Sequence, residues 1–527
     1  MKASILNLMM MVSISDAIGS PNPIWRTSVK ELCGMTPYPN ACRDSLGSSH
    51  IIRSMTELYP SPILYKISVE ISKNEVSKAL KEFVHENGTL AKNASIASIS
   101  SLGTCIQLLS IALDNLNSSL PTTNSDASMS KEAQDNFRTW LSASYADLQT
   151  CVDGFDDASQ DVRRQVMEKL NNSTISVSNS LAIMCKIEDH YVVQPGSSKK
   201  VSMRKSWADA AVLKQMHQLA DVIVAQDGSG NFTTINAALN VVPYRSLNRF
   251  VIYVKNGVYK EIVHVDKDKW NVMMFGDGMN NTTVIGDLNT ASGKGTFDTA
   301  TFAVFGKGFI ARDMGFVNVA KGRYQAVALL STSDQSVFYR CRIESHQDTL
   351  YAHSARQFYR ECNIYGTVDF IFGDSSVVIQ NSFILPYRPI DGNKNTITAQ
   401  GKSNPYSNTG ISIQNCVVSP GQDLTGVLTY LGRPWRNYST TIFMESRMES
   451  LIDPQGWLPW GEPVPDTINY VEFGNKGPGA NVAGRVKWKG VSAQNSTREE
   501  ASMFTVRALI NGDRWLPATG LPFQIDL

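Results

Sequence analysis

Phe338-Tyr-Arg340 recurs twenty residues later as Phe358-Tyr-Arg360, and Val378-Ile-Gln380 lies twenty residues beyond that. Ser412-Ile-Gln414 is a further copy, and the segment 309–316 has the same alternation of residue types. The repeated runs are short, whereas a parallel βαβ unit needs about 30 residues or more because it contains a helix. A period near 20 therefore predicts a solenoid of parallel strands, in which residues one period apart lie on neighbouring rungs about 4.8 Å apart.

The two halves of the chain differ in periodicity. Short β-branched runs punctuated by glycine begin near residue 222 and continue at 250–254 and 272–275, so we expect the solenoid to occupy residues 216–527. Residues 24–190 instead carry apolar side chains at helical spacing, which predicts an all-α bundle. Its two clearest stripes are Leu102, Cys105, Ile106, Leu109, Leu113 and Leu116, and Trp140, Leu141, Ser144, Leu148, Cys151, Val152 and Phe155.

The chain has eight cysteines, and none of them has the spacing of a zinc site, so we expect no metal and no cofactor. Each helical stripe carries one cysteine, so a Cys105–Cys151 bond would join two neighbouring helices. Cys33 and Cys42 bracket a turn-rich loop that a local disulfide could close. The pairing of the remaining four stays open: Cys185, Cys341, Cys362 and Cys416.

Composition narrows the class of protein. A length of 527 residues is too great for one compact core, and a net charge of +1 argues against a nucleic-acid partner bound by a basic field. No interior stretch approaches the ~18 apolar residues of a membrane helix, so we expect no membrane partner. Residues 1–23 resemble an export signal and the chain contains several Asn-X-Ser/Thr sequons, which favours a secreted glycoprotein. The polar, basic stretch 191–215 predicts a linker.

A pair of carboxylates stands out in the solenoid. Asp348 and Asp369 are 21 residues apart, so they are candidates for neighbouring rungs, and Gln325 precedes Gln347 by a similar 22 residues. Two carboxylates at that distance do not both ionise cheaply, so one would stay protonated beside an ionised partner. Two amides beside them could stabilise an oxyanion. The alternative is that these residues form polar ladders with no chemistry.

Ordered motifs carry a resemblance to a known family. The blocks are Gly257-Val-Tyr-Lys-Glu261, Gln325-Ala-Val-Ala-Leu329, Gln347-Asp-Thr-Leu350, Gly366-Thr-Val-Asp-Phe-Ile-Phe-Gly373 and Leu431-Gly-Arg-Pro-Trp435. With these blocks in this order, the chain resembles plant pectin methylesterases (pectinesterases) that carry an N-terminal pectinesterase-inhibitor-like region. The resemblance implies a right-handed parallel β-helix as the catalytic domain, preceded by a four-helix bundle.

The resemblance also implies a role for each polar residue of the pair. Asp369 would be the nucleophile, and Asp348 the general acid that later acts as a base. Gln325 and Gln347 would form the oxyanion hole, and Arg433 would hold Asp369 ionised.

Four further residues would contact substrate by the same resemblance: Thr296, Tyr351, Phe372 and Trp435. Tyr351 and Phe372 would form aromatic walls of the cleft, and Trp435 would pack against a sugar ring. Trp457 and Trp460 lie outside the motifs and fit capping of the solenoid as well as sugar binding.

The implied reaction is hydrolysis of the methyl ester of galacturonate in homogalacturonan (pectin), which releases methanol without a metal, in the plant cell wall. The N-terminal bundle could inhibit this activity by covering the cleft. Two rivals stay open: a solenoid lyase or hydrolase acting on the same polymer, and an inert wall-binding or inhibitor protein that acts through its bundle.

Two departures from the family pattern concern processing and cysteines. The linker has Ser202-Met-Arg-Lys-Ser206 where the family commonly has an Arg-Arg-Leu-Leu site, which leaves cleavage in doubt. The family often pairs the cysteine at 362 with one at the position of Ser382, which cannot form a disulfide here. Cys341 is one residue out of the 20-residue register, so its side chain could face the other way.

Overall fold

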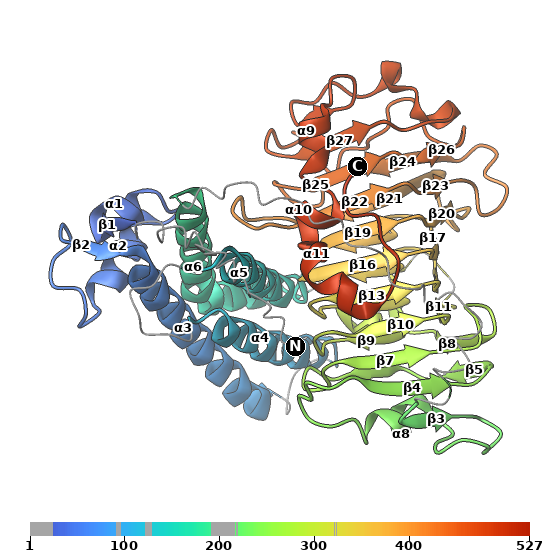
Figure 1. Cartoon of the computed structure of the whole chain (residues 1–527), viewed down its shortest axis with the longest axis horizontal. Helices are drawn as coiled ribbons and strands as arrows, with labels where there is room; N and C mark the ends of the chain where they lie inside the picture. Colours follow the sequence, from blue (N-terminus) through green and yellow to red (C-terminus); the bar gives the residue numbers. More distant parts are fainter. Residues whose placement is uncertain are drawn as a thin grey trace, which may run out of the picture.

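The protein consists of a helical bundle that packs against one side of a β solenoid (Figure 1). The computed structural model describes residues 25–90, 96–121, 129–156, 158–190, 217, 220–320, 322 and 324–527. The predicted export signal and linker lie outside the described residues. No described helix is both long and apolar enough to cross a membrane.

Four long helices form the bundle: α3 (Ser61–Leu90), α4 (Ile96–Ser118), α5 (Lys131–Asp153) and α6 (Gln160–His190). Two short helices, α1 (Val29–Gly34) and α2 (Pro39–Gly47), precede them, together with an antiparallel pair of strands, β1 (Arg26–Ser28) and β2 (Leu58–Pro60). Ser130 caps the N-terminus of α5, because its side-chain oxygen accepts a hydrogen bond from the Ala133 N–H. These elements confirm the predicted four-helix bundle, and the short strand pair is an addition that the sequence pattern did not predict.

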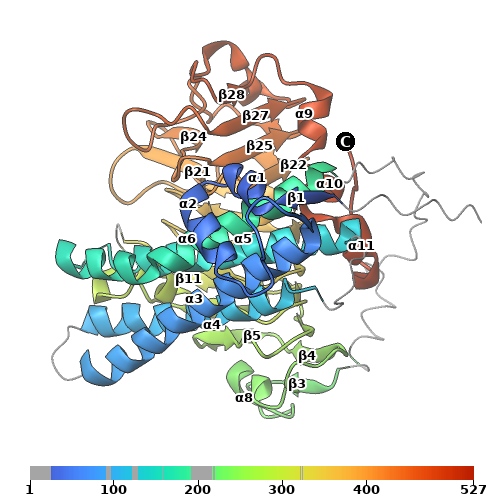
Figure 2. The ribbon, with the colours of Figure 1, turned by 90° about the vertical axis from the view of Figure 1, so that its left-hand side faces the viewer.

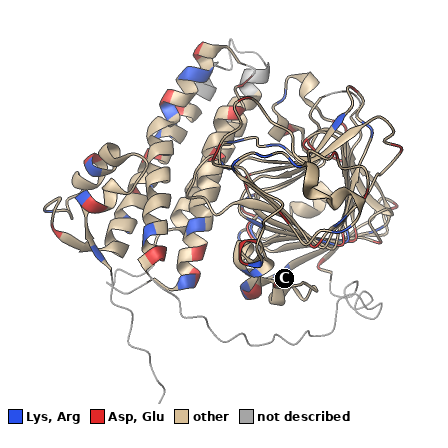
Figure 3. Cartoon of the chain, turned by 90° about the horizontal axis from the view of Figure 1, so that it is seen from above, with Lys and Arg blue, Asp and Glu red and all other residues tan. Residues whose placement is uncertain are grey.

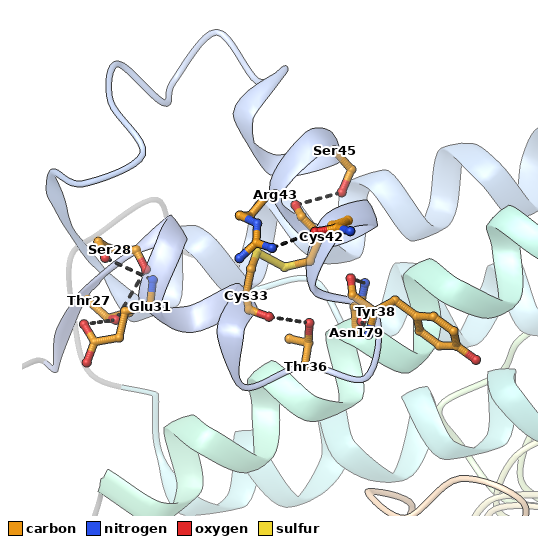
Figure 4. Close-up of a disulfide and its surroundings, with 11 residues drawn as sticks. Thr27, Ser28, Glu31, Cys33, Thr36, Tyr38, Cys42, Arg43, Ser45 and Asn179 are labelled. Atoms are coloured by element: carbon orange, nitrogen blue, oxygen red, sulfur yellow. Dashed lines mark hydrogen bonds between the residues drawn. A yellow bond between two sulfur atoms is a disulfide. The ribbon is translucent and has the colours of Figure 1, made fainter.

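Both predicted disulfides are present in the bundle. Cys33–Cys42 joins α1 to α2 (Figure 4). Cys105–Cys151 joins α4 to α5, the two helices that carry the apolar stripes. The other four cysteines, Cys185, Cys341, Cys362 and Cys416, are buried and unbonded in this structure.

The second half is a right-handed parallel β-helix with three sheets. The first sheet, in spatial order, is β28 (Val491–Ser492), β27 (Asn469–Phe473), β25 (Thr440–Met444), β22 (Gly410–Gln414), β19 (Ser376–Gln380), β16 (Arg356–Arg360), β13 (Ser336–Tyr339), β10 (Ile310–Arg312), β7 (Val272–Phe275), β4 (Phe250–Val254) and β3 (Val222–Val224). The second is β26 (Arg447–Met448), β23 (Val417–Val418), β20 (Phe383–Pro386), β17 (Asn363–Gly366), β14 (Arg342–Glu344), β11 (Gly315–Asn318), β8 (Thr282–Gly286) and β5 (Gly257–Lys260). The third, called the site sheet below, is β24 (Leu428–Gly432), β21 (Lys394–Gln400), β18 (Ile371–Gly373), β15 (Leu350–Ala352), β12 (Leu329–Ser331), β9 (Phe302–Val304) and β6 (Val263–Val265).

Short helices also occur in the second half of the chain. They are α8 (Ile235–Leu239), α9 (Arg498–Ser502), α10 (Val506–Ile510) and α11 (Gly512–Trp515). The last three belong to the C-terminal segment, which packs apolar side chains on the outer face of the first sheet.

The ladder register differs from the motif spacing by one residue. Phe338 pairs with Tyr359, not with Phe358, so the offset between β13 and β16 is one residue longer than the spacing of the motif. Alternate residues of a strand point to opposite faces. Phe338 and Tyr359 therefore both lie inside the solenoid, with stacked rings whose centroids are 4.8 Å apart, whereas Tyr339 and Phe358 pack outside.

This register also corrects the expected orientation of Cys341. Arg342 pairs with Asn363, which makes Cys341 and Cys362 neighbours on adjacent rungs. Both side chains are fully buried in the same interior cluster. Cys341 therefore faces the same way as Cys362, because the ladder offset on these rungs is one residue longer than the motif period.

We predict that Gly373→Ala destabilises the solenoid strongly. Gly373 has φ +127°, and a Cβ there would lie 2.0 Å from the Ala352 carbonyl oxygen on the preceding rung. The matched control is Gly426→Ala, which also has positive φ (+77°) but meets nothing within 4 Å. We expect the control to lose about 1 kcal/mol of unfolding free energy through backbone strain, and Gly373→Ala to lose at least about 3 kcal/mol. Equal losses in thermal or urea unfolding would contradict the close approach.

Candidate active site

Asp348 and Asp369 lie side by side, each two residues before a strand of the site sheet, β15 and β18 respectively. β15 pairs with β18 in the same register as β13 with β16, and the Asp348 N–H donates to the Val368 oxygen at 3.1 Å. Both aspartates have left-handed backbone, with φ +62° and +52°, so the chain makes the same bend on both rungs. Only 8% of Asp348 and 3% of Asp369 is exposed. The two carboxylates thus share one enclosed position on adjacent rungs.

Arg433 holds the Asp369 carboxylate with a two-pronged contact. Its Nε donates to Oδ1 at 2.8 Å, and its Nη2 donates to Oδ2 at 2.6 Å. Arg433 follows β24, two strands away from β18 across the site sheet. A bidentate guanidinium fixes both the charge and the orientation of a carboxylate.

Thr396 is a second partner of Asp369, which the sequence reasoning missed. Its hydroxyl donates to Asp369 Oδ1 at 2.6 Å and accepts from the Asp369 N–H at 2.8 Å. β18 pairs with β21 so that Ile371 meets Thr398, which puts Thr396 directly beside Asp369. The loop before β21 lengthens this rung, so a search at the period of the repeat passes over Thr396.

The two aspartates have different surroundings. Burial, followed by the charge of Asp369, raises the pKa of Asp348 well above its ordinary value. Arg433 and a hydrogen bond from Gln347 oppose this shift. Asp348 therefore keeps its proton to a higher pH than an ordinary aspartate, whereas the Arg433 guanidinium is bound to the carboxylate of Asp369.

The two glutamines lie on the adjacent rungs. The Ala326 N–H donates to the Gln347 carbonyl oxygen at 3.1 Å, so Gln325 is one residue before this contact. Gln325 Oε1 accepts from the Thr290 hydroxyl at 2.8 Å, which leaves its amide N–H₂ as the donor end. Gln347 contacts Asp348 directly.

Aromatic side chains line the site beside the carboxylates. The rings of Tyr351 and Phe372 stack with centroids 4.1 Å apart, and Trp435 meets Phe372 edge-on at 6.1 Å. Trp460 lies 6.4 Å from Trp435 and is 45% exposed. The Arg433 guanidinium carbon is 4.2 Å from the centre of the Trp460 ring.

Trp435, Trp457 and Trp460 occupy two different environments. Trp457 is fully buried in the solenoid interior. Trp460, which lies in no motif, belongs to the site beside Trp435 and was missed for that reason.

Thr296 begins a short 3₁₀ turn, Thr296–Thr299, at the edge of the site. The next residue, Phe297, meets Tyr351 edge-on at 6.1 Å. Asp298 in the same turn accepts from Ser100 and Thr104 of α4, at 2.8 and 2.6 Å. The turn therefore connects the aromatic wall to the bundle.

The bundle lies along the site sheet (Figures 2 and 3). The hydroxyl of Thr150, near the end of α5, lies 2.8 Å from His353 Nε2 and also contacts the Tyr351 hydroxyl. Asp153, the last residue of α5, pairs with Arg436. Tyr351, Phe372 and half-buried Trp435 belong to the same apolar cluster as the bundle helices. The bundle thus packs directly on the aromatic wall.

Among the described residues, no group of three or more His, Cys, Asp or Glu side chains could hold a metal ion. The side chains that the site does offer are two carboxyl groups, two amides and an arginine.

Comparison with known proteins accounts for both halves of the chain. Residues 221–513 match the family "Pectinesterase", and residues 27–183 match "Plant invertase/pectin methylesterase inhibitor". The chain is 45% identical over 508 residues to "Putative pectinesterase/pectinesterase inhibitor 24" of Arabidopsis thaliana, covering 95% of this chain and 88% of the relative. It is 41% identical over 533 residues to "Pectinesterase 3" of Phaseolus vulgaris, covering 97% and 89%.

A solved structure resembles the solenoid half. "Pectin methylesterase from Carrot" is 46% identical, with a TM-score of 0.57, and the match covers 58% of this chain and 98% of that one. The matched part of this chain therefore corresponds to nearly the whole of that chain. With matches over both halves, the chain belongs to the pectinesterase family and is a carboxylic ester hydrolase with an inhibitor-like N-terminal region.

Proposed function

We propose that this chain hydrolyses the methyl esters of homogalacturonan through Asp369 as the nucleophile and Asp348 as the acid and base. The observation that carries the proposal is the pair of enclosed carboxylates on adjacent rungs, of which Arg433 grips only one. A site with tryptophan and tyrosine side chains suits a sugar polymer, and the names of the relatives indicate a pectin substrate. We further propose that the protein is secreted to the plant cell wall.

In the first half of the reaction, an Asp369 oxygen attacks the ester carbonyl carbon. The carbonyl oxygen becomes an oxyanion, which the amide N–H groups of Gln325 and Gln347 stabilise. Collapse of this intermediate breaks the bond to the methoxy oxygen. Asp348 gives its proton to that oxygen, so methanol leaves and an acyl–Asp369 anhydride remains.

In the second half, Asp348 is ionised and acts as the base. It takes a proton from water, whose oxygen attacks the acyl carbon and releases the galacturonate carboxyl group. Asp369 leaves as a carboxylate, which Arg433 again holds, and Asp348 is again protonated. The raised pKa of Asp348 favours this restored state, because it keeps the proton on Asp348 at a pH where an ordinary aspartate would be ionised.

We also propose that the bundle inhibits the solenoid within the same chain. Among the described residues, each Lys or Arg ion pair between the halves has its carboxylate on the bundle and its cation on the solenoid. Asp114 binds Arg245 and Lys267, Asp153 binds Arg436, and Asp135 binds Arg514. The bundle thus presents carboxylates to cationic side chains of the solenoid, as a de-esterified polyuronate would.

The interface also encloses two titratable groups. Burial lowers the pKa of His353 to about 3, and burial raises the pKa of Asp147 on α5 well above its ordinary value. His353 Nδ1 lies 3.9 Å from Asp147 Oδ1. Docking therefore favours neutral His353 and protonated Asp147.

The sign of the pH effect follows from these two directions. Between the ordinary pKa values of 3.8 for aspartate and 6.5 for histidine, docking takes up one proton at Asp147 and releases one at His353, so the two effects cancel. Above about pH 6.5, the release at His353 no longer offsets the proton uptake at Asp147. Docking should weaken as pH rises from there toward the raised pKa of Asp147.

The domain limits remain part of the proposal. We propose a signal peptide at 1–23, a bundle at 24–190, a linker at 191–215 and a catalytic domain at 216–527. The described elements that support these limits are the end of α6 at His190 and the start of β3 at Val222.

We predict that Asp369→Asn abolishes methanol release without unfolding the protein, because the nucleophile is lost while Arg433 and Thr396 keep a partner of the same shape. The charge that raises the Asp348 pKa is also lost, so the carboxylic-acid band of Asp348 should disappear at lower pH in an infrared titration. Substantial methanol release by a folded Asp369→Asn protein would refute the nucleophile. Unsaturated products absorbing in the ultraviolet would indicate a lyase, and a folded wild-type solenoid without any turnover would favour the inert inhibitor.

We predict that Thr396→Val lowers kcat by about 10-fold or more, since the Asp369 carboxylate loses one charge-assisted hydrogen bond of about 1.5–3 kcal/mol. KM should stay within about twofold, because Thr396 contacts the aspartate and not the sugar. The matched control Thr396→Ser keeps the hydroxyl and should recover most of kcat. If serine and valine lowered kcat equally, packing of the methyl group rather than the hydrogen bond would be the cause.

We predict that the full chain is much less active than the 216–527 segment, and that added 24–190 segment inhibits that segment in trans. The double variant Asp114→Lys, Asp153→Lys should release the full chain, because it sets lysine against Arg245, Lys267 and Arg436. The control is Glu168→Lys, on an exposed face of α6 that is lined by bundle residues alone. Inhibition in trans should weaken above about pH 6.5. Equal specific activities of the full and truncated proteins would contradict inhibition.

A further inference from the structure

The bend between the first and second sheets repeats on successive rungs with the same backbone conformation. One non-glycine residue on each rung has left-handed φ between +51° and +54°: Asp313, Arg340, Glu361, Asn381, Asn415 and Glu445. The residue after each of them turns into the solenoid. These inward residues form a single column, which we call the bend column: Met314, Cys341, Cys362, Ser382, Cys416 and Ser446.

Hydrogen bonds join the members of the bend column. The Cys362 N–H donates to the Ser382 hydroxyl at 3.0 Å, and the Ser382 N–H meets Cys416 Sγ at 3.4 Å. The Asn363 N–H donates to the Cys341 oxygen at 2.9 Å, so Cys341 and Cys362 belong to directly bonded rungs. Within the column, these are the two cysteines on adjacent rungs, since Ser382 separates Cys362 from Cys416.

The geometry of the pair suits a disulfide. Neighbouring strands lie about 4.8 Å apart, which falls within the Cα–Cα range of about 4.4–6.8 Å that a disulfide spans. Both side chains are fully buried and point into the same interior, and the Cys362 thiol donates to the Phe338 carbonyl oxygen, on the rung of Cys341, at 3.3 Å. The same chain already carries Cys33–Cys42 and Cys105–Cys151, so it is built for an oxidising compartment.

We propose that Cys341 and Cys362 form a third disulfide, between the two rungs that carry the catalytic carboxylates. Cys341 precedes Asp348 by seven residues on one rung, and Cys362 precedes Asp369 by seven residues on the next. The bond would clamp those rungs in the same register that sets the two carboxylates side by side. Formation of this disulfide does not depend on the proposed function. Its role in positioning the two carboxylates for catalysis does rest on that function.

The oxidation balances with a disulfide of the secretory compartment, such as oxidised glutathione, as the electron acceptor. A thiolate attacks the acceptor disulfide and forms a mixed disulfide, and the second thiol displaces the acceptor's remaining half. Two S–H bonds and one S–S bond are consumed, and one new S–S bond and two acceptor thiols are formed. Because both sulfurs are enclosed in the finished solenoid, the exchange takes place while these rungs assemble.

The test is disulfide mapping of the wild-type full chain secreted from a eukaryotic host. The protein is unfolded in iodoacetamide without reductant and digested with trypsin, which cuts at Arg342, Arg356 and Arg360 between the two cysteines. We expect one cross-linked species that contains Cys341 and Cys362, and alkylated Cys185 and Cys416. Alkylation of both Cys341 and Cys362, or a bond from either one to Cys416, would overturn the proposal.

Thermal unfolding gives a second readout that separates the bond from simple packing. Cys341→Ser and Cys362→Ser should each lower Tm by more than Cys416→Ser, which places the same buried hydroxyl in the same column without breaking a bond. Both variants should also leave one newly alkylatable thiol at the partner position. Equal losses of Tm at all three positions would contradict the proposal that a Cys341–Cys362 disulfide stabilises these rungs. These readouts do not use turnover, so a failure of the assigned catalytic roles would leave them unaffected.

Discussion

The hydrogen-bonded register between adjacent rungs is the constraint on which the rest of the structure depends. A parallel ladder fixes every residue of one strand against one residue of the next, and a shift by one residue would reverse the faces. The shared register of β13 with β16 and of β15 with β18 sets Phe338 on Tyr359 and Asp348 beside Asp369. The carboxylate pair and the apolar interior are thus two consequences of one register, and neither could be moved without the other.

The sequence predicts the solenoid well but its local register less well. The repeat Phe338-Tyr-Arg340 and Phe358-Tyr-Arg360 indicates parallel rungs, yet its spacing is one residue shorter than that of the ladder. Phenylalanine and tyrosine suit both the interior and the outer face of this sheet, because the C-terminal segment also covers the outside with apolar side chains. Residue type therefore does not reveal which of the two faces inward, and the orientation of Cys341 was predicted wrongly for the same reason.

The sequence likewise predicts some residues of the candidate site and not others. Asp348, Asp369 and the aromatic residues three positions after each could be found because their rungs have nearly the same length. Thr396 and Trp460 could not, since loops of unequal length separate them from the residues they contact. The contacts between the bundle and the solenoid are still harder to predict from the sequence. Asp114 contacts Arg245 across 131 residues, and no periodic pattern links the two halves.

One column of residues at the site sheet gives the two aspartates different hydrogen-bond partners. Asp348, Asp369 and Thr396 occupy equivalent positions on three successive rungs. The middle member receives Arg433 from one side and the threonine hydroxyl from the next rung, whereas Asp348 has only Gln347 as a direct partner among the groups that affect its pKa. Burial and the charge of Asp369 raise the pKa of Asp348, whereas the donors of Arg433 and Thr396 reach the Asp369 carboxylate. The solenoid creates this difference by placing a residue of different chemistry at one repeated position on each rung, so two aspartates with nearly the same backbone conformation have different hydrogen-bond partners.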